Sequence, residues 1–147
     1  MAIQSLDTAF KAGSSRMEDG AYYVKEISTV NATQKSYIAA PFRGKLVRAV
    51  FCNGETTMSG SNNYAIGMVN ASDSDAALIT ATTVNDLGSA TYTGAFVAAY
   101  GNVDLLLSTT AANLTFEEGD ILEVTNTVEG TVVSSNLLFY FEPVLSL

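Results

Sequence analysis

The chain contains no histidine and a single cysteine, Cys52, among its 147 residues. Histidine is the commonest general base and the commonest zinc ligand, so either kind of site would have to be built from other residues. One cysteine excludes an internal disulfide and a cysteine-based zinc cage, and we expect Cys52 to be a small buried residue in a strand. The chain also lacks tryptophan and any apolar run near the roughly 20 residues that a membrane span needs.

The start of the chain has no apolar core of the kind found in signal peptides, because Gln4, Asp7, Lys11 and Arg16 interrupt it. We therefore expect a protein made in a cytoplasm, with no membrane partner.

Positive charge is missing from most of the chain. All seven Lys and Arg residues lie before residue 50 together with four acids, so this stretch has a net charge of +3. Residues 51–147 contain eleven acids and no cation. The downstream acids must face solvent, pair with upstream cations, or meet another chain or an ion. An acidic surface repels phosphate, so we expect no nucleic acid partner.

The charge split has two interpretations. In the first, the acids form a solvated surface that keeps the protein soluble. In the second, the basic N-terminal part docks onto an acidic partner while the acidic part faces outward.

From residue 22 onward the chain shows the pattern of short β-strands. Stretches rich in Thr, Val and aromatic residues are separated by turn signals at intervals of about ten residues. No helical period long enough for a βαβ unit is present. The pattern predicts an all-β, two-sheet antiparallel sandwich or barrel of about eight to ten strands. The expected strands are 22–27, 34–39, 44–52, 64–70, 78–84, 91–100, 105–107, 114–116, 121–125 and 132–144.

Strand 44–52 has a simple alternation. It predicts one face made of Leu46, Arg48, Val50 and Cys52, with the intervening residues on the other face.

Residues 1–20 differ from the rest of the chain. Ile3, Leu6 and Phe10 follow the i, i+3, i+7 spacing of a short helical face. A segment this short does not hold a helix alone in water, so it is either an arm that orders on a partner or a frayed terminus. We divide the chain into an N-terminal arm, 1–20, and a β-sandwich domain, 21–147. Five arm residues are the candidate partner-binding residues: Ile3, Leu6, Phe10, Lys11 and Arg16.

The motifs that could carry chemistry are incomplete. Asp73-Ser74-Asp75 resembles the start of a calcium loop, but Val84 stands where the terminal Glu is required. The segment 118–120, Glu-Gly-Asp, is typical of a structural β-turn. We therefore expect a protein that is not an enzyme and that has no catalytic residue, cofactor or metal site. A calcium ion that bridges the acidic loops is left as an alternative.

Four features in order carry a resemblance to a known family. They are the segment 38–47, IAAPFRGKLV; the strand 64–70, YAIGMVN, after a long Ser/Thr/Gly loop; the turn 118–120 with its strand; and an apolar strand after Gly130 that ends in FYF at 139–141. In this order they resemble the jelly-roll head decoration, or cement, proteins of tailed bacteriophages. The likeness covers about residues 34–144.

The resemblance implies a jelly-roll β-sandwich that forms a homotrimer on the outer capsid surface of the virion. It implies that the protein binds the major capsid protein and stabilises the shell by cross-linking neighbouring copies. The family also has an N-terminal arm that lies along the shell. The apolar end of the chain exceeds what one sheet face needs, so we expect part of it to lie between subunits: Leu137, Leu138, Phe139, Phe141, Val144, Leu145 and Leu147. A core strand that is buried on both faces would show the same pattern.

Two alternatives belong to other classes of function. The first is a glycan-binding β-sandwich module of a phage fibre or another adhesion protein, in which tyrosines are stacking platforms. The candidates are Tyr22, Tyr23, Tyr64, Tyr92 and Tyr100. The second is a small carboxylate hydrolase, which the incomplete motifs disfavour.

Overall fold

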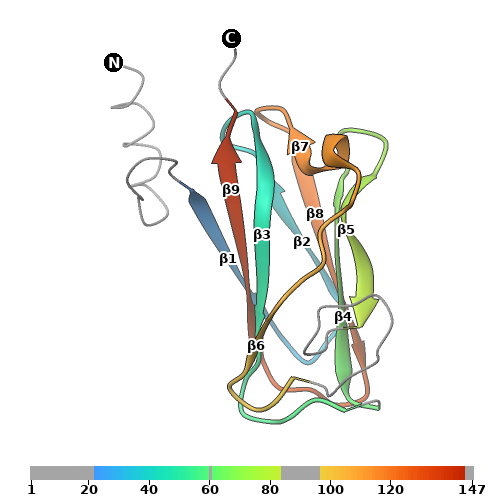
Figure 1. The fold of residues 1–147 in the computed structure, drawn as a ribbon. Helices are drawn as coiled ribbons and strands as arrows, with labels where there is room; N and C mark the ends of the chain where they lie inside the picture. Colours follow the sequence, from blue (N-terminus) through green and yellow to red (C-terminus); the bar gives the residue numbers. More distant parts are fainter. Residues whose placement is uncertain (1–21, 60, 84–96, 145–147) are drawn as a thin grey trace.

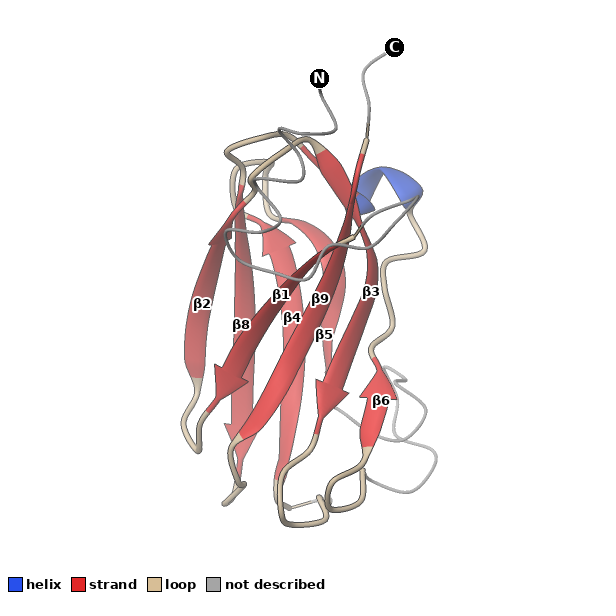
Figure 2. Cartoon of the chain, turned by 90° about the vertical axis from the view of Figure 1, so that its left-hand side faces the viewer, coloured by secondary structure: helices blue, strands red, loops and turns tan. Residues whose placement is uncertain are grey.

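The computed structural model describes residues 22–59, 61–83 and 97–144. Within these residues the chain forms nine β-strands and one short 3-10 turn. The elements are β1 (Tyr23–Thr29), β2 (Gln34–Ala39), β3 (Gly44–Cys52), β4 (Asn63–Asn70), β5 (Ala76–Thr83), β6 (Asn102–Asp104), η1 (Ala111–Leu114), β7 (Thr115–Phe116), β8 (Ile121–Glu129) and β9 (Ser135–Pro143). The strands form two antiparallel sheets that face each other (Figures 1 and 2), so the predicted all-β sandwich is confirmed.

The order of the strands is nested. The first sheet has the order β1-β9-β3-β6, with β7 also paired to β3, and the second has the order β2-β8-β4-β5. The first strand thus pairs with the last, the second with the one before the last, the third with β6 and β7, and the fourth with the fifth. This pairing is one long antiparallel hairpin rolled into two layers, which is the jelly roll.

The space between the sheets is filled by side chains that alternate along the strands. In β9, Leu137, Phe139 and Phe141 are buried, whereas Leu138 and Tyr140 lie half-buried on the outer face. This is the period of two expected when one face of a strand covers a core. Both sheets supply the largest fully buried side chains: Tyr64, Phe51, Phe139, Phe141, Leu46, Ile66, Met68, Leu78, Ile79, Leu122 and Leu137.

The alternation predicted for strand 44–52 fails at one point in β3. Leu46 pairs with Phe141 and the next paired residue is Arg48, so Val47 is an extra residue, a β-bulge. Leu46 and Ala49 therefore both face the core, although they are three residues apart. The predicted face that grouped Leu46 with Arg48 is wrong, because the bulge shifts the pattern by one position. Arg48 lies on the outer face of the first sheet.

Most predicted strands lie within a few residues of the observed ones, and 34–39 and 44–52 agree at both ends. The strand predicted at 105–107 is wrong, because β6 ends at Asp104 and Leu106 is exposed. Two short strands pair with the same edge of β3: β6 pairs near the end of β3, and β7 pairs at the start of β3. The chain between these two strands therefore leaves the sheet and passes through η1 (Figure 1).

The strand predicted at 91–100 lies mostly outside the described residues. The part within them, 97–100, is a loop followed by a turn. The prediction is wrong there, because Tyr100 has a positive φ of 59° that does not fit a strand.

Candidate functional site

The sandwich has two loop ends, the arm end and the far end. β1 begins where β9 ends, because Tyr23 pairs with Phe141, so residue 22 enters the sandwich at the arm end. The arm end consists of the loops 40–43, 71–75 and 117–120. The far end consists of the loops 30–33, 53–59, 61–62, 97–101 and 130–134. A strand of nine residues separates the two ends by roughly 30 Å.

The two ends differ in charge. The arm-end loops carry six charged residues: Arg43, Asp73, Asp75, Glu117, Glu118 and Asp120. In the described loops of the far end, Glu55 is the single charged residue, with Glu129 next to them at the end of β8. The far end is otherwise built from Asn, Thr, Ser, Gly and apolar residues.

At the arm end, the turn 117–120 is hydrogen-bonded to the end of β4 and to the loop 40–43, and Asp120 makes the bond to β4. Its carboxylate accepts hydrogen bonds from the Glu117 amide at 2.9 Å and from Asn70 Nδ2 at 2.8 Å. Gly119 has a φ of 86° and donates its amide to the Ala40 carbonyl. The predicted structural turn at 118–120 is therefore present, and the carboxylate of Asp120 holds it together.

A shallow pocket of about 330 Å³ opens beside this turn. It is lined by Asn70, Ser72, Asp73, Thr115, Phe116, Glu117 and Asp120. Glu117 forms an ion pair with Arg43 at 3.3 Å, and Asp120 is engaged in the turn. In the described part of the chain, no three Asp, Glu or Cys side chains converge in a way that could hold a metal ion.

Asp73-Ser74-Asp75 forms the connection between β4 and β5 rather than a calcium loop. Ser74 and Asp75 have positive φ values of 51° and 58°, and the carbonyl of Asp73 accepts a hydrogen bond from the Ala76 amide. The segment therefore folds as a tight turn between two strands.

Cations from the first fifty residues form ion pairs with acids from the rest of the chain. The pairs are Lys35–Glu123 at 2.9 Å, Arg48–Asp104 at 2.9 Å, Arg43–Glu117 at 3.3 Å and Lys45–Glu142 at 3.7 Å. The hydrogen bond and the charge of Glu123 raise the pKa of Lys35, and those of Asp104 raise the pKa of Arg48. The nested topology is the cause, since it places β2 beside β8, and β3 beside β6 and β9.

These ion pairs explain the segregation of cations and acids along the sequence. The positive excess of the first fifty residues comes from strands and loops of the sandwich, where it is neutralised within the chain. Residues 1–20 contain two cations and three acids and are not basic. The split is thus accounted for by topology and is not a separate signal for docking.

The five predicted binding residues of the arm lie outside the described residues: Ile3, Leu6, Phe10, Lys11 and Arg16. Their role stays a prediction.

Two of the tyrosines named as sugar platforms pack against the core. Tyr64 is fully buried, and its hydroxyl donates to the Val133 carbonyl at 2.5 Å. The prediction for Tyr64 is wrong, because it points to the inner face of β4. Tyr23 is half-buried, with its ring against Phe42 and Phe141.

Tyr22 is half-buried and Tyr92 lies outside the described residues. Tyr100 is 76% exposed at the far end, which leaves its ring free to stack. A further exposed tyrosine, Tyr37, lies on the outer face of the second sheet, and sequence reasoning did not single it out.

The exposed position of Tyr100 is held by hydrogen bonds to the neighbouring loop. The amide of Tyr100 donates to the Gly54 carbonyl at 2.8 Å, and the Gly101 amide donates to the Ala98 carbonyl at 3.0 Å. The Ala99 amide donates to Thr57 Oγ1 at 3.2 Å. The turn 98–101 is therefore bound along its length to the loop 53–59.

Asn53 is the polar centre of the far end and is 7% exposed. Its Nδ2 donates to the carbonyls of Thr56, Val97 and Ala98 at 2.9, 3.2 and 3.0 Å. Its Oδ1 accepts from the Gly54 amide and from Ser135 Oγ. The sequence shows only an Asn-Gly turn signal here, because Val97, Ala98 and Ser135 are distant from Asn53 in sequence.

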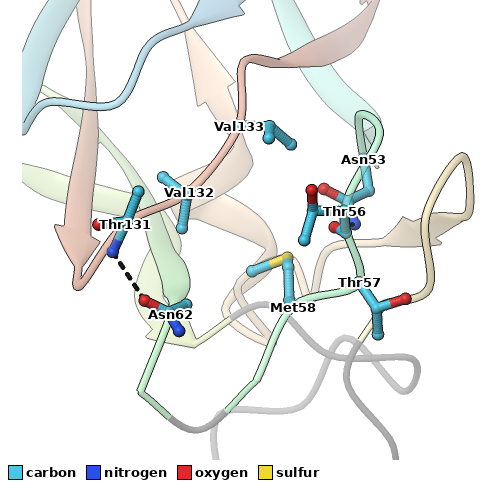
Figure 3. A pocket seen from close by; sticks show the side chains of 8 residues that line it. All are labelled: Asn53, Thr56, Thr57, Met58, Asn62, Thr131, Val132 and Val133. Carbon is cyan, nitrogen blue, oxygen red and sulfur yellow. Dashed lines mark hydrogen bonds between the residues drawn. The ribbon is translucent and has the colours of Figure 1, made fainter.

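A small pocket of about 70 Å³ lies next to Asn53 (Figure 3). It is lined by Asn53, Thr56, Thr57, Met58, Asn62, Thr131, Val132 and Val133. Asn62 closes one side, because its Oδ1 accepts a hydrogen bond from the Thr131 amide at 2.7 Å. The far end therefore combines an exposed aromatic ring with neutral polar side chains.

The outer faces of both sheets carry apolar side chains. On the second sheet, Tyr37 and Ile121 are 60% and 36% exposed. The register places Glu123 next to Tyr37 in its row, followed by half-buried Val69 and Ala77. On the first sheet, half-buried Leu138 is paired with Val50 and lies next to Tyr140.

The apolar end of the chain is divided between these surfaces. Leu137, Phe139 and Phe141 belong to the core of the single chain, so the expectation of a subunit interface does not apply to them. Leu138 lies on the outer face, where that expectation stays a prediction. Leu145 and Leu147 lie outside the described residues.

Cys52 is half-buried at the end of β3, in register with Asn136 and Asn102. Burial raises the pKa of its thiol, so the reactive thiolate form is disfavoured.

Comparisons with known proteins find a similarity to a solved structure. No family model matches the chain, and no curated protein matches it. The chain is similar to a chain of the solved structure "Capsid of Ralstonia phage GP4", with 15% sequence identity and a TM-score of 0.48. The likeness covers 94% of this chain and 96% of the other. A TM-score below 0.5 does not establish a shared fold, so this likeness says nothing about what the chain does. In the described residues no helix is long and apolar enough to cross a membrane.

Proposed function

We propose that this chain is a viral structural protein that binds the outside of a phage capsid. In this role it forms a homotrimer and stabilises the shell by cross-linking neighbouring copies of the major capsid protein. The proposal rests on the sequence resemblance to the head decoration proteins of tailed bacteriophages. The nested jelly-roll pairing is the observation that carries it, because that pairing is the architecture the resemblance implies.

The fold alone does not decide between functions, since jelly rolls also serve as lectins and cupins. A role in assembly is supported by the outer faces of the sheets. Apolar side chains are accessible to solvent on the outer faces of both sheets, where polar residues are usual: Tyr37, Ile121 and Leu138. Proteins that assemble bury such side chains against their partners.

The chemistry of the arm end also fits a structural role. Its best-placed carboxylates, Glu117 and Asp120, are used within the chain, in an ion pair and in a turn. Polar groups that support the fold in this way are not arranged as an acid and a base around a substrate.

The arm, 1–20, joins the sandwich at the arm end, because β1 begins there. We place the capsid contact on the apolar residues Ile3, Leu6 and Phe10. Lys11 and Arg16 act as electrostatic helpers only, since the segment as a whole is not basic.

The test is a binding assay with shells assembled from the major capsid protein of the phage that encodes this chain. Full-length protein should cosediment with the shells, and deletion of residues 1–20 should abolish cosedimentation while the sandwich stays folded. A triple substitution of Ile3, Leu6 and Phe10 by serine should weaken binding more than the control K11Q/R16Q. The proposal fails if the deletion variant decorates shells as well as the full chain does.

The oligomeric state is a separate measurement. Sedimentation equilibrium of the purified chain should give the mass of a trimer, and chemical cross-linking should give a trimer for the shell-bound chain. A chain that is monomeric in both measurements contradicts the trimer and leaves shell binding to be judged by the cosedimentation assay.

A glycan-binding module is the second candidate function. One observation favours it, the exposed ring of Tyr100 at the end opposite the arm.

A further inference from the structure

We propose that the far end of the sandwich binds a neutral glycan, with Tyr100 as the platform on which a sugar ring stacks. This proposal rests on the second candidate function and deepens it by naming the platform residue and the class of glycan, and it does not depend on capsid binding. A protein attached to a shell through its arm end would present the far end outward, roughly 30 Å away.

Tyr100 has a positive φ, which the fold of the turn does not require from a tyrosine. It is 76% exposed and its φ is 59°, in the left-handed region that residues with a large side chain rarely adopt. The other two non-glycine residues with positive φ among those described, Ser74 and Asp75, are small and polar and tolerate it better. Glycine would satisfy the same turn with less strain, and the core gains nothing from an exposed ring. A large, exposed side chain at a strained backbone position indicates that the side chain has a function.

The ring of Tyr100 is carried by a turn that is already ordered. Backbone hydrogen bonds join Tyr100 to Gly54 and Gly101 to Ala98, and Asn53 Nδ2 donates to the Ala98 carbonyl. Asn53 itself is buried and fully engaged. A site that is ordered before binding loses little conformational entropy when the ligand arrives.

The surroundings of Tyr100 supply the second requirement for sugar binding, which is neutral hydrogen-bonding groups. Thr56 and Thr57 lie in the loop that is hydrogen-bonded to the turn of Tyr100. Together with Asn62 they line the small pocket at this end of the sandwich (Figure 3), and Ser61 next to Asn62 is exposed. Sugars present hydroxyl groups at the edge of the ring and C–H groups on its face. Hydroxyl and amide side chains match the edge, and an aromatic ring matches the face.

The charge of the far end selects among glycans. The described far-end loops contain no Lys or Arg, and Lys35, which follows the loop 30–33, is paired with Glu123. The acids near these loops, Glu55 and Glu129, repel carboxylate, phosphate and sulfate groups. Acidic sugars such as sialic acid should therefore be excluded, and nucleic acid as well.

The first experiment applies the full-length protein to an array of neutral and sialylated oligosaccharides. Each bound oligosaccharide is then titrated by calorimetry as a single soluble molecule, so that multivalency plays no part. Binding should be confined to neutral oligosaccharides. A folded protein that binds none of them, or that prefers the sialylated ones, overturns the proposal.

The second experiment separates the ring from the fold. Tyr100→Gly removes the ring and relieves the positive φ, so it should lower the affinity about tenfold or more without lowering the melting temperature. Tyr100→Trp should retain binding. Tyr37→Ala is the matched control, because it removes an exposed tyrosine elsewhere, and it should leave the calorimetric affinity unchanged. Equal affinities for wild type and Tyr100→Gly overturn the proposal.

The same variants distinguish this proposal from the capsid hypothesis. Tyr100→Gly should cosediment with shells as the wild type does, and deletion of residues 1–20 should retain glycan binding. If Tyr100→Gly loses shell binding, the far end is a capsid contact and the glycan proposal is wrong.

Discussion

Asn53 offers a sharp test of how the far end is held together. Its Nδ2 carries two protons that three carbonyls of the loops 53–59 and 97–101 share, and its Oδ1 accepts from Gly54 and Ser135. The side chain therefore makes about four full hydrogen bonds, each worth about 1 kcal/mol net when buried. Water can replace part of them at the rim of the loops. We expect Asn53→Ala to lower the free energy of unfolding by about 2–4 kcal/mol.

The measurement is equilibrium unfolding in urea at one fixed protein concentration, since an oligomer's stability depends on concentration. Asn62→Ala is the control, because Asn62 is half-buried and its Oδ1 accepts one hydrogen bond from a backbone amide. It should cost about 1 kcal/mol. Asn53→Asp keeps the shape but replaces the donors with a carboxylate that faces carbonyl oxygens, so it should cost at least as much as Asn53→Ala. The reasoning is refuted if Asn53→Ala costs no more than Asn62→Ala.

Three further predictions concern other parts of the chain. Gly119→Ala should lower the free energy of unfolding by about 1 kcal/mol, because a φ of 86° is the sole obstacle to a Cβ there. Gly130→Ala should lower it by at least about 1 kcal/mol more, because the new Cβ would also meet a backbone carbonyl. Equal shifts in the thermal unfolding of the two variants would contradict this. A double-mutant cycle of Arg48→Ala and Asp104→Ala should give a coupling energy of about 0.2–1 kcal/mol that falls with salt, since both side chains are about half exposed or more; a coupling near 3 kcal/mol would contradict it. Cys52, with its raised thiol pKa, should react with a thiol reagent at mildly alkaline pH more slowly in the folded chain than in urea, and equal rates would count against the burial of this side chain.

Local patterns were sufficient to predict the strands of the sandwich. Residues 34–39 and 44–52 were predicted to the residue, because alternation and the turn residues around them are properties of a few neighbours in sequence. The segment 105–107 was mistaken for a strand because three leucines indicate burial but not a pairing partner. Which edge a strand can join is decided by the rest of the sheet, and here β6 and β7 already occupied it.

The same limit explains the bulge and the ion pairs. Nothing in the alternation around Val47 marks it as the extra residue, since the mismatch arises from the register between β3 and β9. The sequence also shows that acids and cations are segregated, but not that they meet. Lys35 and Glu123 become neighbours only because the chain rolls up as a nested hairpin.

The candidate site was predictable in part. Tyr100 was among the tyrosines named from the sequence, yet so was Tyr64, because composition does not separate an exposed ring from a buried one. Asn53 could not be recognised, because most of its partners are distant in sequence.

The sequence by itself determined the all-β class, the strand periods, the turns and the lack of histidine, since these depend on residue types and on close neighbours along the chain. The tertiary structure decided the jelly-roll order, the face that each side chain occupies, the neutralisation of the upstream cations and the contrast between the acidic arm end and the neutral far end. The physical reason is that each of these depends on contacts between residues far apart in sequence, which the chain makes only when the two sheets close over a common core.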